Sequence, residues 1–121
     1  MESGRTVLII PGLGDSGPQH WQTLWEASHP EYRRVQQSDW EQPRREDWTR
    51  NIDAAMSSAK SPVVLVAHSM GCIATVHWAL SSGANGPVAA AFLVAPPDVE
   101  ADTIPGRSDW FCSVSTKPPA F

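Results

Sequence analysis

The feature that most constrains the fold is residues 63–72, where an apolar run changes abruptly into a helical pattern. Residues 63–67 are continuous and rich in β-branched side chains, which is typical of a strand buried on both faces. The chain then turns at residues 68–71 and continues with apolar residues at helical spacing. A tight turn from strand to helix places its central residue at the carboxyl edge of a sheet, beside a helix N-terminus. The stretch therefore predicts an α/β fold with Ser69 at the edge of its sheet.

The serine of this turn lies in the sequence Ala67-His68-Ser69-Met70-Gly71, which departs from the pattern G-x-S-x-G only at its first position. In that pattern the turn projects a nucleophilic serine above the sheet, and small flanking residues let the neighbouring backbones approach. The alternative is that Ser69 only caps the following helix, a role that serine readily fills. The turn by itself leaves both interpretations open.

Five further segments repeat the two patterns on either side of this stretch. Short apolar runs bounded by Gly or Pro predict strands, and apolar residues three and four apart predict helices. The expected strands are residues 6–10, 32–38, 63–68 and 88–95, and the expected helices are residues 21–28, 44–59 and 70–82. This alternation predicts a three-layer α/β fold, a doubly wound parallel sheet with helices on both faces. Right-handed crossovers favour the strand order 2-1-3-4.

Each of the three expected helices has an apolar stripe. In the first helix, Trp21, Leu24, Trp25 and Ser28 are spaced i, i+3, i+4 and i+7, as on one helix face. The tryptophans are expected to line the core or a cleft. In the second helix the stripe consists of Trp48, Ile52, Ala55, Met56 and Ala59. In the helix after Ser69 the stripe consists of Ile73, Val76 and Leu80.

Composition limits the remaining possibilities. With 121 residues, of which 41% are hydrophobic, the chain is expected to form one domain, residues 1–121, with an irregular tail over about residues 98–121. A net charge of −4 argues against nucleic-acid binding, which needs a clustered basic surface. The sequence has no signal-peptide pattern and no apolar run long enough to span a membrane, so we expect a soluble cytoplasmic protein. The two cysteines, Cys72 and Cys112, are expected to be free thiols.

The glycine-rich segment 11–17 has two possible roles. At the switch point of the predicted sheet it would lie against Ser69, and backbone N–H groups of Leu13 and Met70 could then stabilise an oxyanion, with Gly12 and Gly14 allowing close approach. The alternative is a dinucleotide site, because residues 12–17 also form G-x-G-x-x-G after a strand, with Asp39 near the position of the ribose-binding acid.

Three blocks of sequence together resemble a known family. They are Pro-Gly-Leu-Gly-Asp-Ser-Gly-Pro-Gln-His-Trp at residues 11–21, Asp-Trp at residues 39–40, and Val-Ala-His-Ser-Met-Gly-Cys at residues 66–72. They look like the small α/β-hydrolases related to retinoblastoma-binding protein 9 and to the bacterial YdeN proteins, over residues 6–97. The resemblance implies a flavodoxin-like sheet and a serine hydrolase that acts on carboxylic esters or amides, without a cofactor, with Ser69 at the position of the nucleophile.

The family's catalytic Asp and His lie on loops after further strands, and the sequence stops at Phe121 before them. The resemblance thus implies a C-terminally truncated form with impaired activity, and a non-catalytic binding module is the alternative. The four histidines, His20, His29, His68 and His77, all precede the position of the family histidine, and their spacing fits no metal motif. His20 and His68 are expected to line the cleft. His20 is interpreted as a histidine of the sheet edge or of the first helical turn, in preference to a substitute base. The sheet edge around Leu93 is expected to be uncovered, which would allow pairing with a second chain.

Overall fold

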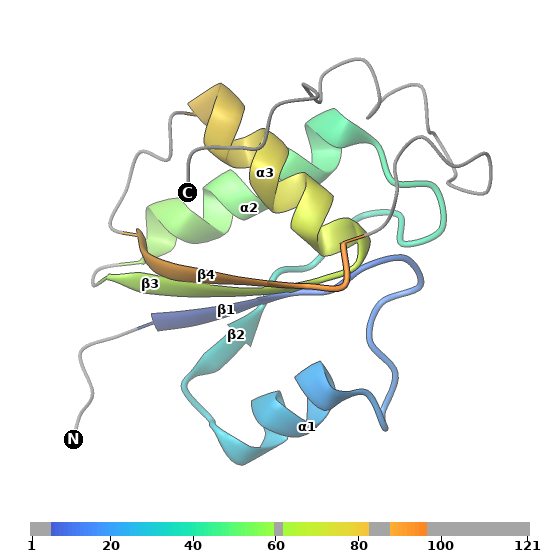
Figure 1. Cartoon of the computed structure of the whole chain (residues 1–121), viewed down its shortest axis with the longest axis vertical. Helices are drawn as coiled ribbons and strands as arrows, with labels where there is room; N and C mark the ends of the chain where they lie inside the picture. The colour runs from blue at the N-terminus through green and yellow to red at the C-terminus, as the bar shows by residue number, and fades with distance from the viewer. Residues whose placement is uncertain (1–5, 60–61, 83–87, 97–121) are drawn as a thin grey trace.

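The computed structural model describes residues 6–59, 62–82 and 88–96 as four parallel strands and three helices (Figure 1). In chain order they are β1 (Thr6–Ile10), α1 (Trp21–Ser28), β2 (Tyr32–Arg34), α2 (Arg45–Ser58), β3 (Val63–His68), α3 (Met70–Ser82) and β4 (Val88–Val94). The strands form one sheet in the order β2-β1-β3-β4, and every neighbouring pair is parallel. The predicted α/β class and strand order are confirmed.

The sheet lies between two helical layers, with α1 on one face and α2 and α3 on the other (Figure 1). The larger core forms on the side of α2 and α3, because alternate residues of the strands point to the same face. Its buried members are Leu8, Ile10, Val63, Leu65 and Ala67 from the strands, Val35 directly after β2, Trp48, Ile52 and Met56 from α2, and Met70, Cys72, Ala74 and Trp78 from α3. This packing holds β1 and β3 side by side, and their carboxyl ends lead to the two predicted site segments.

The apolar stripe predicted for α1 does not face the sheet. Leu24 and Trp25 are 50% and 46% exposed, whereas Gln22 is completely buried. The Gln22 amide donates to the carbonyl oxygens of Ile10 (3.3 Å) and Val66 (3.0 Å), so a polar residue fixes the orientation of the helix. Hydrophobic periodicity cannot detect a contact of this kind. The expectation that the tryptophans line the core or a cleft is therefore wrong for Trp25, whereas it is confirmed for Trp48 and Trp78, which are buried in the core.

The stripe predicted for α3 is also displaced. Leu80 is 57% exposed, while Ala74, Thr75 and Trp78 are buried. The helix is apolar on most sides, so spacing alone does not single out the face that packs on α2 and the sheet.

Other differences concern segment ends: α2 is Arg45–Ser58 rather than residues 44–59, and β4 ends at Val94 rather than at residue 95. The second strand ends at Arg34 rather than residue 38, although Val35 N–H still donates to the Ile9 carbonyl at 2.8 Å. The expected irregular tail, including Cys112, lies outside the described residues. Within the described sheet β4 is the last strand, and pairing of its edge with a second chain stays a prediction.

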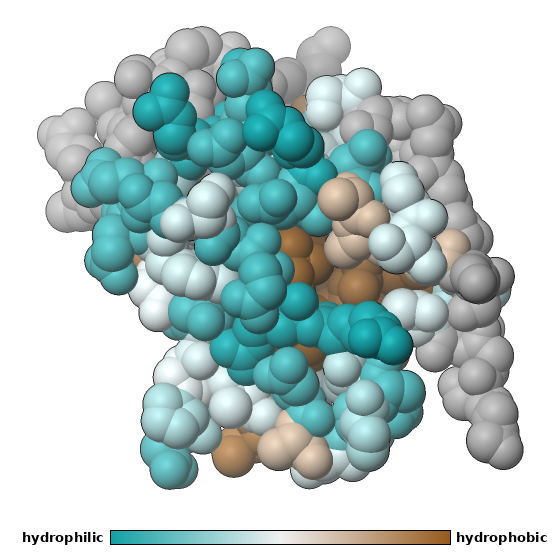
Figure 2. All heavy atoms as spheres, turned by 180° about the vertical axis from the view of Figure 1, so that it is seen from behind, coloured by the Kyte–Doolittle hydropathy of each residue, from teal (hydrophilic) through white to brown (hydrophobic). Residues whose placement is uncertain are grey.

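The side of the molecule turned away in Figure 1 is largely hydrophilic, with an apolar area among the polar side chains (Figure 2). Strand β2 has only three residues, and a hollow is present between β1, β2 and α2. Its lining residues are Thr6, Leu8, Arg33, Arg34, Ala55, Ser58 and Ala59. The hollow includes the first residue of β1, whereas Ser69 follows the last residue of β3, so it is not the predicted site.

Candidate active site

Ser69 lies at the junction of β3 and α3 with a left-handed backbone, φ 56°. This conformation is unfavourable for a residue with a Cβ atom and is retained only where surrounding contacts enforce it. Here Ser69 N–H donates to the Val94 carbonyl at 3.0 Å, and the Ser69 carbonyl accepts from Cys72 N–H at 2.8 Å. The turn is therefore held by β4 on one side and by the first turn of α3 on the other.

Two glycines allow the chain to close around this turn. An added Cβ at Gly71 would lie only 2.2 Å from the Ile10 carbonyl oxygen, so α3 starts in direct contact with the end of β1. An added Cβ at Gly12 would lie 2.9 Å from Ser69 Cβ and 3.1 Å from Met70 N. The loop after β1 thus packs against the Ser69–Met70 peptide, as the switch-point argument predicts.

The loop itself is a tight turn with a defined shape. Asp15 N–H donates to the Gly12 carbonyl at 3.2 Å, and Gly14 has φ 72°, which is the conformation needed at the third position of a type II turn. Gly14 N–H donates to the Trp40 carbonyl at 2.9 Å. Because the Gly14 N–H is already used in this hydrogen bond, it is not free to serve as an oxyanion donor in place of the Leu13 N–H. That the N–H groups of Leu13 and Met70 together bind an oxyanion stays a prediction.

Two of the predicted cleft histidines lie together. The rings of His20 and His68 are 4.5 Å apart edge to face, and Trp21 contacts both. Burial, and to a smaller extent the neighbouring His20, lowers the pKa of His68 below its usual value. The neutral form of His68 is therefore favoured on the α1 side of the sheet.

The position of His20 limits what its ring can do. It caps α1, and its Nδ1 accepts the backbone N–H of Gln22 at 3.1 Å. In the neutral ring the proton then lies on Nε2, which makes Nε2 a donor and not a base. Within residues 6–59, 62–82 and 88–96, no histidine nitrogen hydrogen-bonds to Ser69 Oγ, and no cluster of side chains fits a metal ion.

The buried thiol of Cys72 is also part of this region. It is 1% exposed, and its Sγ donates to the Val94 carbonyl at 3.4 Å. Burial raises the pKa of Cys72 to about 11, so the thiol stays protonated at neutral pH. The prediction that Cys72 is a free thiol is confirmed, and the thiol lies in the core.

The structure argues against the dinucleotide alternative. A fingerprint of that type needs a helix that opens directly at the glycines. Here α1 begins only at Trp21, and an added Cβ at Gly17 would meet no atom within 4 Å, so this glycine does not serve close helix packing. Asp39 Oδ1 accepts the backbone N–H groups of Glu41 and Gln42, which makes it a turn residue.

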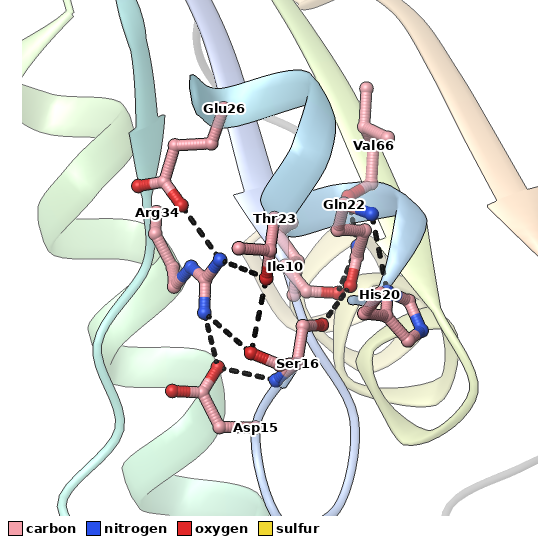
Figure 3. Close-up of polar contacts among 9 residues, drawn as sticks. All are labelled: Ile10, Asp15, Ser16, His20, Gln22, Thr23, Glu26, Arg34 and Val66. Atoms are coloured by element: carbon pink, nitrogen blue, oxygen red, sulfur yellow. Dashed lines mark hydrogen bonds and ion pairs between the residues drawn. The ribbon is translucent and has the colours of Figure 1, made fainter. Parts of the chain in front are cut away.

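A polar network behind the loop was not predicted from the sequence (Figure 3). It joins Asp15 and Ser16 of the loop to Gln22 and Glu26 of α1 through Arg34 and direct hydrogen bonds. The partners are up to 19 positions apart in the sequence. No local spacing rule connects polar residues across such an interval.

Comparison with known proteins defines the class. The model of the serine hydrolase family matches residues 7–121, so the chain belongs to this family. A solved structure described as a YdeN-like hydrolase from Pectobacterium atrosepticum has a TM-score of 0.74 and 33% sequence identity. The match covers 85% of this chain and 55% of that protein. A search of curated proteins found no match.

The family and fold inferred from the three sequence blocks are thus confirmed. The matched region corresponds to little more than half of the YdeN-like hydrolase. As for membranes, none of the helices in residues 6–59, 62–82 and 88–96 combines the length and the apolar character needed to cross a bilayer.

Proposed function

We propose that the protein is a hydrolase of carboxylic esters or amides in which Ser69 is the nucleophile. The observation that carries the proposal is the left-handed backbone of Ser69 at the β3–α3 junction, with Gly12 packed against its Cβ. A strained serine at this position is typical of a nucleophile elbow, a turn that presents the serine hydroxyl at the edge of the sheet. Simple helix capping would not require the loop after β1 to approach so closely.

In this reaction Ser69 Oγ forms a bond to the substrate carbonyl carbon, and the carbonyl oxygen becomes an oxyanion. Backbone N–H groups of Leu13 and Met70 donate to that oxyanion. A general base takes the Ser69 proton and returns it to the leaving alcohol or amine as that bond breaks, and water then hydrolyses the acyl-serine. The tight turn and the contact with Gly12 support a loop that is preorganised for this role.

A general base is the remaining requirement. In the family that the sequence resembles, Asp and His match positions beyond Phe121, and His20 uses Nδ1 to cap α1. We therefore expect the 121-residue polypeptide to hydrolyse its substrate several orders of magnitude more slowly than an enzyme with a complete triad. The remaining rate enhancement would come from the oxyanion donors.

A fluorophosphonate probe tests the proposal because it bonds covalently to an activated serine. We expect slow labelling of the wild-type chain at Ser69, identified by peptide mass spectrometry, and none in Ser69→Ala. Ser57→Ala is the matched control, since Ser57 is an exposed serine in the last turn of α2, before the first residue of β3, whereas Ser69 follows the last residue of that strand. Absence of label at Ser69 after prolonged incubation, in a folded sample, would contradict the assignment. Labelling at a similar rate in Ser69→Ala would do the same.

A further inference from the structure

We infer that Arg34 is a positioning residue, which acts through the loop at residues 12–16 to hold the Leu13 N–H in place above Ser69. The inference rests on the proposed function, because Leu13 matters only if an oxyanion forms there. Arg34 lies at the end of β2, behind the loop (Figure 3).

The Arg34 guanidinium joins the loop to α1. Nη1 donates to Asp15 Oδ1 at 2.9 Å and to the Ser16 carbonyl at 3.1 Å. Nη2 donates to Thr23 Oγ1 at 2.8 Å and to Glu26 Oε1 at 2.6 Å. One side chain thus binds both the carboxylate and the backbone of the loop, and the first helix at the same time.

This arrangement is specific for arginine. The Arg34 side chain is only 10% exposed, so its ion pairs with Asp15 and Glu26 are weakly screened. A planar guanidinium can direct donors to two separate groups in fixed directions, whereas a lysine ammonium is a single point charge. Replacement by lysine should therefore keep part of the contact and lose its geometry.

A second anchor acts on the neighbouring residue. Ser16 Oγ donates to Gln22 Oε1 at 2.5 Å, and the Gln22 amide donates to the carbonyls of Ile10 and Val66. Thr23 Oγ1 also donates to the Ser16 carbonyl at 3.1 Å. Ser16 is thereby connected to β1, β3 and α1. Arg34 binds Asp15, which is the last residue of the turn that the Asp15 N–H closes onto the Gly12 carbonyl.

The loop needs such anchors because it carries little regular structure of its own. Asp15 has φ 64°, and Gly14 has φ 72°, two successive left-handed residues that few sequences adopt without external contacts. An oxyanion donor is effective only if it is held at its final position before reaction. Misplacement by about 1 Å can lower a rate by about 100-fold. Because Leu13 is only two residues before Asp15, greater motion of Asp15 and Ser16 should also displace the Leu13 N–H.

The test compares Arg34→Gln and Arg34→Lys with Arg33→Gln, a matched control in which the exposed neighbour on the same strand is changed. The labelling rate at Ser69 is measured as a function of fluorophosphonate concentration, which gives the maximal rate and the concentration for half-maximal rate. The rate of hydrogen exchange is measured for the backbone amides of residues 13–16. Circular dichroism and tryptophan fluorescence confirm that each variant is folded.

We expect Arg34→Gln to lower the maximal labelling rate by about 10-fold or more, with little change in the half-maximal concentration, and to speed exchange at residues 13–16. Arg34→Lys should be intermediate, and Arg33→Gln should match the wild type. If Arg34→Gln does not fold, Asp15→Gly replaces it, because glycine tolerates the positive φ of this position while the carboxylate is removed.

The outcomes separate the inference from the proposed function. Labelling of the wild type at Ser69, with equal rates in the variants of Arg33 and Arg34, overturns the positioning role and leaves Ser69 as the nucleophile. Slower labelling without faster loop exchange also overturns it, because the effect would not pass through the loop. A wild-type chain that is never labelled at Ser69 overturns both.

Discussion

Replacement of Gly71 by alanine tests whether α3 really begins in contact with the end of β1. Gly71 is the second residue of α3, and the Cβ of an alanine there would lie 2.2 Å from the Ile10 carbonyl oxygen and 2.7 Å from that of Pro11. Ordinary contact starts at 3.4 Å, so helix and strand would have to separate by about 1.2 Å. Both partners are backbone, and neither can rotate away.

The expected cost follows from this overlap. Overpacking of a core costs about 1–3 kcal/mol, and a clash between two main chains belongs at the upper end of that range. The better helix propensity of alanine offsets less than about 1 kcal/mol, since Gly71 lies in the first turn. We expect the free energy of unfolding to fall by about 2–3 kcal/mol, which corresponds to about 8–12 °C in Tm.

Urea denaturation followed by tryptophan fluorescence measures this change, with Gly17→Ala as the control. An added Cβ at Gly17 meets no atom within 4 Å, so this substitution should stay within about 0.5 kcal/mol of the wild type. If Gly71→Ala is as stable as Gly17→Ala, the direct contact of α3 with the end of β1 is refuted. Close approach of these two backbones would then no longer explain why a small residue follows the Ser69 turn.

Two further predictions concern polar groups behind the site. Gln22→Leu keeps the volume but leaves Ser16 Oγ and two strand carbonyls without their partner, so we expect a loss of about 2–4 kcal/mol in urea denaturation; an unchanged midpoint would contradict the anchor role. The second prediction is a pH dependence. Because burial lowers the pKa of His68 below 6.5 in the folded state, the unfolded chain binds a proton at higher pH than the folded chain. The free energy of unfolding should be highest above about pH 6.5 and fall below it, and His68→Gln should flatten this slope; equal slopes in both proteins would exclude His68 as the cause.

The strand and helix positions are predictable because they depend on local patterns. Continuous apolar runs define β1, β3 and β4, and right-handed crossovers in a doubly wound sheet with helices on both faces predict their order. The predicted second strand is too long, since Val35 is buried and pairs with Ile9 without continuing the strand. In the sequence, a buried apolar residue that follows a short edge strand cannot be distinguished from a further residue of that strand.

The orientation of α1 could not be predicted from the same patterns. Hydrophobic spacing assumes that the apolar side of a helix faces the sheet, but near the carboxyl ends of β1 and β3 the sheet also presents backbone carbonyls to α1. The Gln22 amide donates to two of them and accepts the hydroxyl of Ser16. Leu24 and Trp25 are consequently turned outward.

The same reasoning explains why one half of the candidate site was visible in the sequence and the other was not. Ser69 and Gly71 are restricted by backbone geometry, because a left-handed residue and a close approach limit the residue types that fit. Arg34 is selected by partners on the loop and on α1, and any exposed arginine of a short strand has the same local sequence pattern. A residue that positions the site from a distance therefore becomes recognisable only once the fold has brought β2, the loop and α1 together.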